Sequence, residues 1–232
     1  MNSDSSPSEI KQRYIDELGE KLGSIFYALL KELVCLNDKW DEFVTLYGTK
    51  PERLDLLNAS AAHFFMVVQN VIWDDTLLHI YRLTCPSKSG RGKSANEQLT
   101  INRLPSLVDE EIHKTISKQV KIAVEKSNFC HEWRHNKIAH PNLDIALKKN
   151  IEPLPDASRA KVNEAIKAIS CVLNTITKHY LNTTTDFEPI KMANGAESLL
   201  YVLDDGLKAQ KERTQRIKER NYTKDDLKHR DL

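Results

Sequence analysis

The chain has 232 residues, of which 40% are hydrophobic and 29% are charged. This length and composition suit one helical domain with an appended segment. Lys and Arg number 34 against 33 Asp and Glu, and the resulting net charge of +1 excludes binding to nucleic acid through global charge alone.

Cysteine spacing and the N-terminus bear on the compartment. Cys35, Cys85, Cys130 and Cys171 are widely spaced without a CxxC pair, so neither a zinc knuckle nor a disulfide framework is indicated. We expect Cys35, Cys130 and Cys171 to be core thiols. The polar start of the chain lacks the apolar stretch of a signal peptide, and no apolar run reaches the roughly 18 residues of a membrane span. We therefore expect a cytoplasmic protein without membrane contact.

Long helices are predicted, because the whole chain has only 7 glycines and 8 prolines to interrupt them. Apolar residues at helical spacing predict one helix from about Ser8 to Tyr47 and another from Pro51 to about Leu83. The second is apolar around much of its circumference, so we expect it at the centre of the bundle. Residues 86–96 are expected to form a mobile basic loop, because GRGKS lacks the spacing of a P-loop and no strand precedes it.

Three more helices complete the prediction. The first runs from about Asp109 to Ile138, with acidic residues in its first turn, where the helix dipole favours them. The next follows a proline-rich connection and would be capped by Asp156 or Ser158. The last spans roughly residues 196–220 and is apolar in its first half and charged in its second.

These patterns predict an all-α fold, an antiparallel helical bundle of about five helices. We divide the chain into a disordered N-terminus (1–9), the bundle (10–185), and a C-terminal helix with a charged tail (186–232).

The residues best suited to chemistry end the helix predicted to close at Ile138. The stretch WRHNKIAHP, residues 133–141, places Arg134, His135, Asn136 and His140 together. Arginine holds phosphate in a fork geometry, and histidine moves protons near neutral pH. Pro141 disfavours helical backbone at His140, so we expect a turn that brings its imidazole back toward Arg134. Alternatively, His140 meets the free carbonyls of a helix end.

Arg134 has two interpretations. On a helical wheel it lies about 40° from Ile112 and so extends the apolar stripe of its helix. A charge there requires a partner or a wet cleft. Arg134 therefore either pairs with a carboxylate such as Asp74 or Asp75, or faces an open site.

A second motif overlaps the first, because residues 131–135 also match HExxH. In a zinc hydrolase His131 and His135 would hold the metal and Glu132 would act as the base. Against this stand the missing third ligand, the absence of a strand to bind an extended peptide, and the positive charge of Arg134 beside the metal. We expect no metal and no cofactor, and keep the zinc hydrolase as a remote alternative.

The stretch from Arg134 to His140 resembles the R-x(4–6)-H motif of HEPN domains. It is close to the form R-[ND]-K-x-x-A-H, with His135 at the position where Asn or Asp is commoner. The stretch HIYRLTCPSK from His79, with LTINRL from Leu99, is similar to the AbiU-type branch, named for phage abortive infection. With the order of the helices, the resemblance covers roughly residues 10–185.

The resemblance implies a HEPN-like bundle and a metal-independent endoribonuclease that acts in phage defence or as a toxin. Arg134 and His140 would be catalytic, with support from His135 and Asn136. The 2′-OH of a ribose would attack the adjacent phosphorus and leave a 2′,3′-cyclic phosphate. The expected RNA-binding residues are Lys137, Arg82, Arg91, Lys93 and Arg103.

The resemblance also implies partners. RNA is the expected substrate, a homodimer is the expected assembly, and an antitoxin or a nucleotidyltransferase is a further candidate partner. The alternative function is a HEPN module that binds RNA or another protein without cutting.

Overall fold

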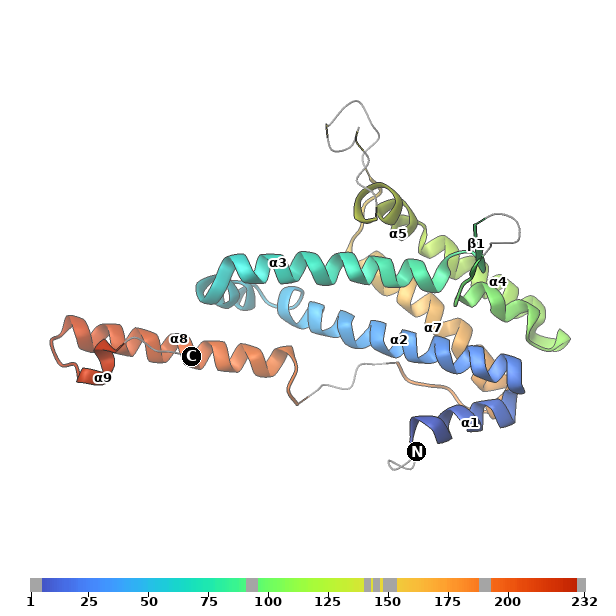
Figure 1. Cartoon of the computed structure of the whole chain (residues 1–232), viewed down its shortest axis with the longest axis horizontal. Coiled ribbons are helices and arrows are strands. Elements are labelled where there is room, and N and C mark those ends of the chain that lie inside the picture. Colours follow the sequence, from blue (N-terminus) through green and yellow to red (C-terminus); the bar gives the residue numbers. More distant parts are fainter. Residues whose placement is uncertain are drawn as a thin grey trace. The chain divides into compact units, whose positions relative to one another are not determined.

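The computed structural model describes residues 6–90, 96–139, 143, 147, 154–187 and 193–228 and is mostly helical (Figure 1). The chain divides into two units. Unit 1 comprises Met1–Lys39 and Trp73–Pro189, and unit 2 comprises Trp40–Ile72 and Ile190–Leu232. Two long helices, α2 (Glu20–Tyr47) and α3 (Pro51–Thr84), contribute residues to both.

The first predicted helix is in fact two helices, α1 (Pro7–Leu18) and α2. Gly19 separates them with a φ of 81°, which glycine adopts without the steric penalty that other residues meet. Ser6 caps α1 in a capping box with Glu9. Residues 7–9, which we expected to be disordered, are therefore helical.

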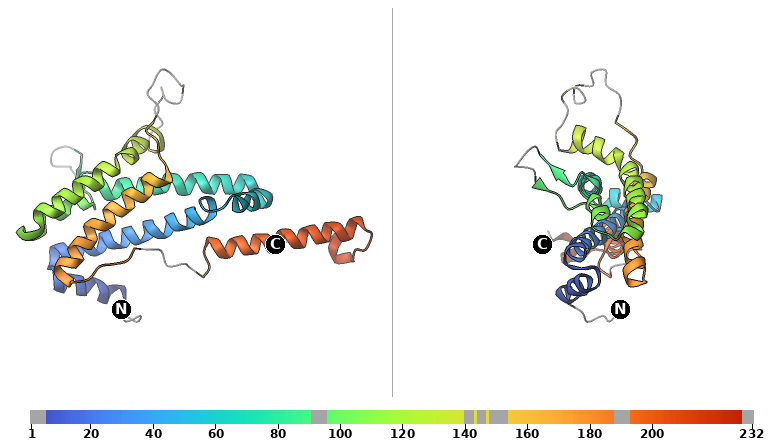
Figure 2. Two further views of the ribbon diagram at one scale, coloured as in Figure 1. Left: turned by 180° about the vertical axis from the view of Figure 1, so that it is seen from behind. Right: turned by 90° about the vertical axis from the view of Figure 1, so that its right-hand side faces the viewer.

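Unit 1 packs its helices around one apolar core. It contains α1, parts of α2 and α3, α4 (Glu110–Lys126), α5 (Asn128–Trp133) and α7 (Arg159–Leu181). Ser158 caps α7, and α4 lies beside α7 (Figure 2). The largest fully buried side chains of this core include Phe26, Leu29, Leu33, Leu77, Ile80, Leu83, Ile116 and Ile169.

One buried polar group links α2 to α3 within unit 1. The side chain of His79 lies with Nε2 2.9 Å from a Glu32 carboxylate oxygen and Nδ1 3.3 Å from Lys39 Nζ. Lys39 also pairs with Asp75. Burial lowers the pKa of His79, and the nearby charges of Lys39 and Arg82 act in the same direction. This network fixes the second half of α3 against α2.

The region expected to be a basic loop contains a short hairpin. Strand β1 (Lys88–Ser89) pairs antiparallel with β2 (Asn96–Glu97), and a 3₁₀ helix, η2 (Ile101–Ser106), follows. Asn102 donates hydrogen bonds of 3.0 Å to the carbonyls of Thr84 and Cys85. Its amide therefore ties η2 to the end of α3.

The single helix predicted from Asp109 to Ile138 is interrupted. Ser127, at φ −97° and ψ −1°, separates α4 from α5, and its buried hydroxyl donates a 2.8 Å hydrogen bond to the Ala123 carbonyl. Such bonds to a preceding carbonyl compete with the helical ladder and bend helices. After α5 comes a π-helical turn, η3 (Arg134–Ile138), closed by a 3.0 Å bond from the Ala139 N–H to the Arg134 carbonyl.

Unit 2 has a smaller core. It combines the end of α2 and the first half of α3 with α8 (Ala196–Lys218) and α9 (Lys224–Leu227). Its core cluster consists of Leu46, Leu57, Phe65, Ala196 and Leu200. Ala61, at φ −161° and ψ 68°, interrupts the helical geometry of α3 in this unit.

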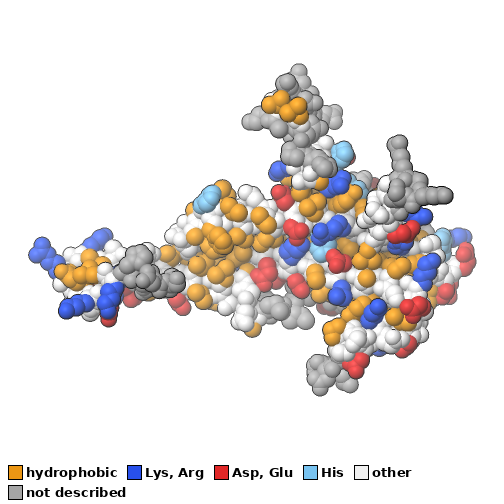
Figure 3. All heavy atoms as spheres, in the orientation of Figure 1, with side chains coloured by type: hydrophobic (Ala, Val, Ile, Leu, Met, Phe, Trp, Pro, Cys, Tyr) orange, Lys and Arg blue, Asp and Glu red, His pale blue; other side chains and the backbone are white. Residues whose placement is uncertain are grey.

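The first half of α3 is not central, contrary to our prediction. Phe64 and Val71 are each 61% exposed, and Met66 and Val67 are exposed beside them. Figure 3 shows hydrophobic side chains gathered where this part of α3 lies. In the described part of the chain, α3 is also the one helix long and apolar enough to cross a membrane. Contiguous exposed apolar surface of this kind is typical of an interaction surface.

The cysteines divide differently from the prediction. Cys130 is buried as expected, whereas Cys35 and Cys171 are exposed because they lie on outward faces of α2 and α7. Cys85, which follows α3, is buried as well.

Candidate active site

Arg134 lies at the start of η3 and is half-buried. Its guanidinium carbon is 5.0 Å from the ring centroid of Tyr81 on α3, within the range of a cation–π contact. Among the described residues, no carboxylate lies within ion-pair distance of Arg134. The alternative pairing with Asp74 or Asp75 is therefore wrong, and Asp75 pairs with Lys39 instead.

Two pairs of side chains, one on each helix, bring α3 and α5 together at this point. Tyr81 and Thr84 share a face of α3, and His131 and Arg134 share a face of α5 and η3, because residues three apart lie side by side on a helix. The rings of Tyr81 and His131 meet edge to face, with centroids 4.7 Å apart and planes at 68°. Tyr81 thus contacts both His131 and Arg134.

The contact of His131 with Thr84 assigns the imidazole tautomer. His131 Nε2 lies 3.3 Å from Thr84 Oγ1, and the same hydroxyl donates a 2.8 Å bond to the Ile80 carbonyl. A hydroxyl has one proton to donate. Its oxygen therefore accepts from His131, and Nε2 carries the imidazole proton.

The electrostatics leave Arg134 as the charged member of this cluster near neutral pH. Burial lowers the pKa of His131, with Arg134 acting in the same direction and Glu132 opposing it. Burial also raises the pKa of the Cys85 thiol, against the attraction of Arg134. His131 and Cys85 are therefore expected to be uncharged.

The rest of the motif surrounds the π-helical turn. His135 is exposed, and Asn136 donates a 3.2 Å hydrogen bond to the Glu132 carboxylate. His140, the second predicted catalytic residue, lies outside the described residues, so its role stays a prediction.

Trp133 fastens this turn to the rest of unit 1. Its indole Nε1 donates a 2.8 Å hydrogen bond to the Pro155 carbonyl, in the segment that leads into α7. Lys137 Nζ lies 4.4 Å from the Trp133 ring centroid, within the range of a cation–π contact.

The two histidines of the HExxH match have different environments. His131 directs Nε2 to Thr84, whereas His135 is exposed. Within the described ranges, no three His, Cys, Asp or Glu side chains gather in a metal-binding group.

The predicted RNA-binding residues lie on different elements. Arg82 is exposed on α3 beside Tyr81. Arg103 donates a 2.8 Å hydrogen bond to the Ser87 carbonyl and pairs with Glu97, so its guanidinium holds the hairpin together. Arg91 and Lys93 lie outside the described residues. The RNA-binding role of each residue stays a prediction.

Sequence reasoning missed Tyr81, Thr84 and His131 as neighbours of Arg134. The three-residue spacings within each helix were visible in the sequence. What the sequence did not provide was the register of α3 against α5, which decides that these two pairs meet.

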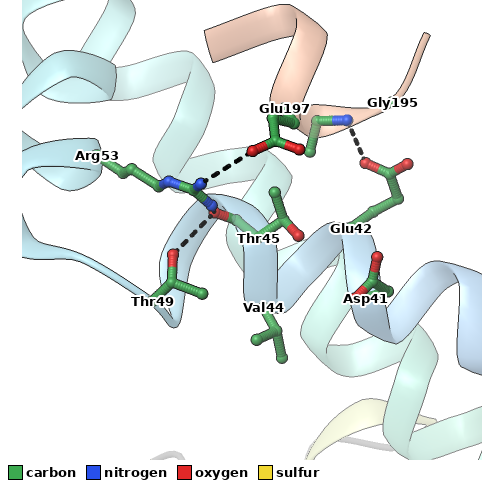
Figure 4. Close-up of a pocket in the computed structure, with 9 residues that line it drawn as sticks. Asp41, Glu42, Val44, Thr45, Thr49, Arg53, Gly195 and Glu197 are labelled. Carbon is green, nitrogen blue, oxygen red and sulfur yellow. Dashed lines mark hydrogen bonds and ion pairs between the residues drawn. The ribbon is translucent and has the colours of Figure 1, made fainter. Parts of the chain in front are cut away.

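Unit 2 contains a pocket at the start of α8 (Figure 4). The carboxylate of Glu42 accepts a hydrogen bond from the Ala196 N–H. Arg53 donates a 2.6 Å bond to the Thr45 carbonyl and lies 3.7 Å from a Glu197 oxygen. These charged groups interact with one another, and their contacts hold the start of α8 in place.

The comparison with known families agrees with the helical fold. The family model described as AbiU2, of the HEPN group, matches residues 19–198, which is more than half of the chain. The matched region contains Tyr81, Arg134 and His140. No curated protein and no solved structure matches the chain.

Proposed function

Because the chain belongs to the AbiU2 family of HEPN proteins, which is associated with abortive infection as a phage defence, we propose that it is a metal-independent endoribonuclease. The observation that supports this most is the state of Arg134. Its half-buried guanidinium contacts the ring of Tyr81, and in the described part of the chain its side chain makes no hydrogen bond or ion pair. Such a group is suited to bind phosphate.

Other arginines with reduced exposure sharpen this argument. The side chains of Arg53 and Arg103 are each 20% exposed, and each pairs with a carboxylate, Glu197 and Glu97 respectively. Their charges are neutralised within the protein. Arg134 differs from both, because no carboxylate of the described residues pairs with it, and in this proposal its positive charge binds a ligand.

The proposed reaction is an internal transesterification of RNA. The ribose 2′-oxygen attacks the adjacent phosphorus, the bond to the 5′-oxygen breaks, and the products end in a 2′,3′-cyclic phosphate and a 5′-hydroxyl. His140 removes the proton from the 2′-OH as general base or supplies one to the leaving oxygen as general acid. Arg134 stabilises the charge that develops on the phosphoryl oxygens. His135 and Asn136 orient these groups or contact the phosphate.

We also propose that the protein acts in the cytoplasm as a homodimer. A second copy would cover the apolar side chains that the first half of α3 exposes. In this proposal Lys137, with Arg82, Arg91 and Lys93, follows the RNA backbone, because lysine and arginine neutralise its phosphates. Arg103 is left out of this set, because Glu97 pairs with its guanidinium.

A module that binds without cutting is the second candidate, and the exposed face of α3 favours it. Phe64 and Val71 offer apolar surface to a protein partner, such as an antitoxin or a nucleotidyltransferase. This candidate predicts a stable complex and no RNA cleavage by the purified protein.

The test is RNA cleavage by purified protein in EDTA, with end-group analysis of the products. Arg134→Ala and His140→Ala should each slow cleavage by about 100- to 10,000-fold while helical circular dichroism is kept. Arg13→Ala is the matched control, because Arg13 also lies over a tyrosine ring, at 5.7 Å from Tyr14, in α1. It should cut normally.

Three results would contradict the proposal. Both site variants could fold and cut at the normal rate, which would place the site elsewhere. Loss of folding in Arg134→Ala would make the arginine structural. Cleavage abolished by EDTA would point to a metal enzyme.

A further inference from the structure

Tyr81 contacts Arg134 through its aromatic ring, whereas Arg53 and Arg103, which are also partly buried, pair with carboxylates. The guanidinium lies over the aromatic ring, where the negative face of the π-system attracts the cation. A carboxylate would occupy two of the five N–H donors of the guanidinium with its two oxygens. An aromatic ring attracts the charge without accepting those in-plane donors.

Tyr81 is itself held. His131 contacts its ring edge to face, and the Nε2–H of His131 is directed to the Thr84 hydroxyl. Thr84 is 1% exposed and bonded to the Ile80 carbonyl, one turn earlier on α3. The ring of Tyr81 therefore belongs to a packed cluster in which Thr84 is bonded to the backbone of α3 and His131 is bonded to the Thr84 hydroxyl.

We propose that Tyr81 is a positioning residue for Arg134, whose ring holds the guanidinium with its N–H donors free to receive the phosphate of an RNA substrate. The inference rests on the proposed ribonuclease function. The aromatic ring of Tyr81, and not its hydroxyl, is required, because Tyr81 contacts Arg134 and His131 through its ring. His131 supports Tyr81 and does not itself touch the substrate.

Two substitutions separate the ring from the hydroxyl. Tyr81→Phe keeps the ring and should cleave RNA at the wild-type rate. Tyr81→Leu keeps apolar volume but removes the ring, and should lower the single-turnover rate about 10- to 100-fold, because a misplaced catalytic group reduces the rate by that order. Tyr222→Leu, at an exposed tyrosine of unit 2, controls for the loss of a tyrosine and should cut normally.

A nuclear magnetic resonance measurement reads the position of Arg134 without any activity. The ring current of Tyr81 should shift the side-chain signals of Arg134 upfield in the wild type and in Tyr81→Phe. The shift should vanish in Tyr81→Leu. This readout remains available in the wild type if Tyr81→Leu fails to fold.

The outcomes distinguish this inference from the proposed function. Cleavage by Arg134→Ala at the normal rate would overturn the ribonuclease site. An inactive Arg134→Ala together with a fully active, folded Tyr81→Leu would overturn the role of Tyr81 alone. Absence of the upfield shift in the wild type would also overturn it. A slow Tyr81→Phe would show that the hydroxyl acts, which the inference denies.

Discussion

The two units bury their apolar side chains to different extents. In unit 1, Phe26, Leu33 and Ile116 have no exposed surface. In unit 2 a five-residue cluster forms the core, and Phe64 and Val71 keep 61% of their surface exposed.

Helix α3 shows what this difference teaches, because it contributes to both units with an apolar composition throughout. Leu77, Ile80 and Leu83 in its second half are buried among neighbouring helices, whereas the first half exposes side chains of the same kind. An apolar helix surface is expected to be buried against something. Whether other elements of the same chain bury it depends on where those elements lie, and the composition of the helix does not reveal this.

The largest expected effect is on the two cores. Phe26→Ala, in unit 1, should reduce the free energy of unfolding by about 3–5 kcal/mol, because it leaves a cavity in a closely packed interior. Leu200→Ala, in unit 2, should reduce it by less, because Leu200 keeps 7% exposure in a smaller cluster that can relax around the gap. Urea denaturation measures both. Equal losses would show that unit 2 is as tightly packed as unit 1.

The second expected effect concerns association through unit 2. The double variant Phe64→Ser with Val71→Ser should turn the proposed homodimer into a monomer, because it removes apolar surface that a second copy would cover. Light scattering during gel filtration reports the mass. The stability of the monomer fold should change little, since these side chains are exposed. A wild type that is strictly monomeric at micromolar concentration would remove the homodimer from the proposal.

A smaller effect is expected from pH, because acidification should lower the stability of unit 1. Burial lowers the pKa of His79 and of His131 from the ordinary value of 6.5. The unfolded chain therefore binds more protons than the folded chain below pH 6.5, so the free energy of unfolding should fall as the pH falls below that value. Each unit of pKa difference corresponds to about 1.4 kcal/mol.

Urea midpoints at pH 7.5 and pH 5.5 measure this dependence. His79→Gln should lower stability at pH 7.5 and flatten the pH dependence, because the glutamine does not titrate. His63→Gln is the control, since His63 is exposed in unit 2. A midpoint that rises on acidification would contradict the burial of both histidines as neutral groups.

The smallest effect is expected from Glu132→Gln. Glu132 is exposed and accepts a hydrogen bond from Asn136, and in the proposed ribonuclease mechanism it has no chemical role. Cleavage should stay near the wild-type rate, and elemental analysis should find no stoichiometric zinc. One zinc per chain, with activity lost in Glu132→Gln and kept in His140→Ala, would instead support the zinc hydrolase.

Much of the fold was predictable because the apolar residues of long helices repeat at helical spacing in the sequence. Pro51 starts α3 and Ser158 caps α7, as their side chains suggested. The breaks at Gly19 and Ser127 were not predicted, because the apolar stripe continues through both. The hairpin was missed since a ladder of two residues per strand has no periodicity to detect.

The candidate site was predictable to a similar degree. Residue chemistry and the helical wheel singled out Arg134 and placed it at the edge of the apolar stripe. The aromatic partner was not predicted, because a ring contact needs no charge complement in the sequence. Charge alone indicated Asp74 and Asp75 as partners, yet the register of α3 places the ring of Tyr81 against the guanidinium.

The π-helical turn after α5 has a consequence for how such sites diverge. In it the Ala139 N–H bonds to Arg134, five residues back, where a regular α-helix would bond to His135. The turn thus absorbs one more residue than an α-helical turn between the arginine and the histidine of the motif. Family members whose motif is one residue shorter should lack this bulge. The length of the motif should therefore vary together with the helix type, π-helical or α-helical. In both cases the arginine would keep its contact with the aromatic ring.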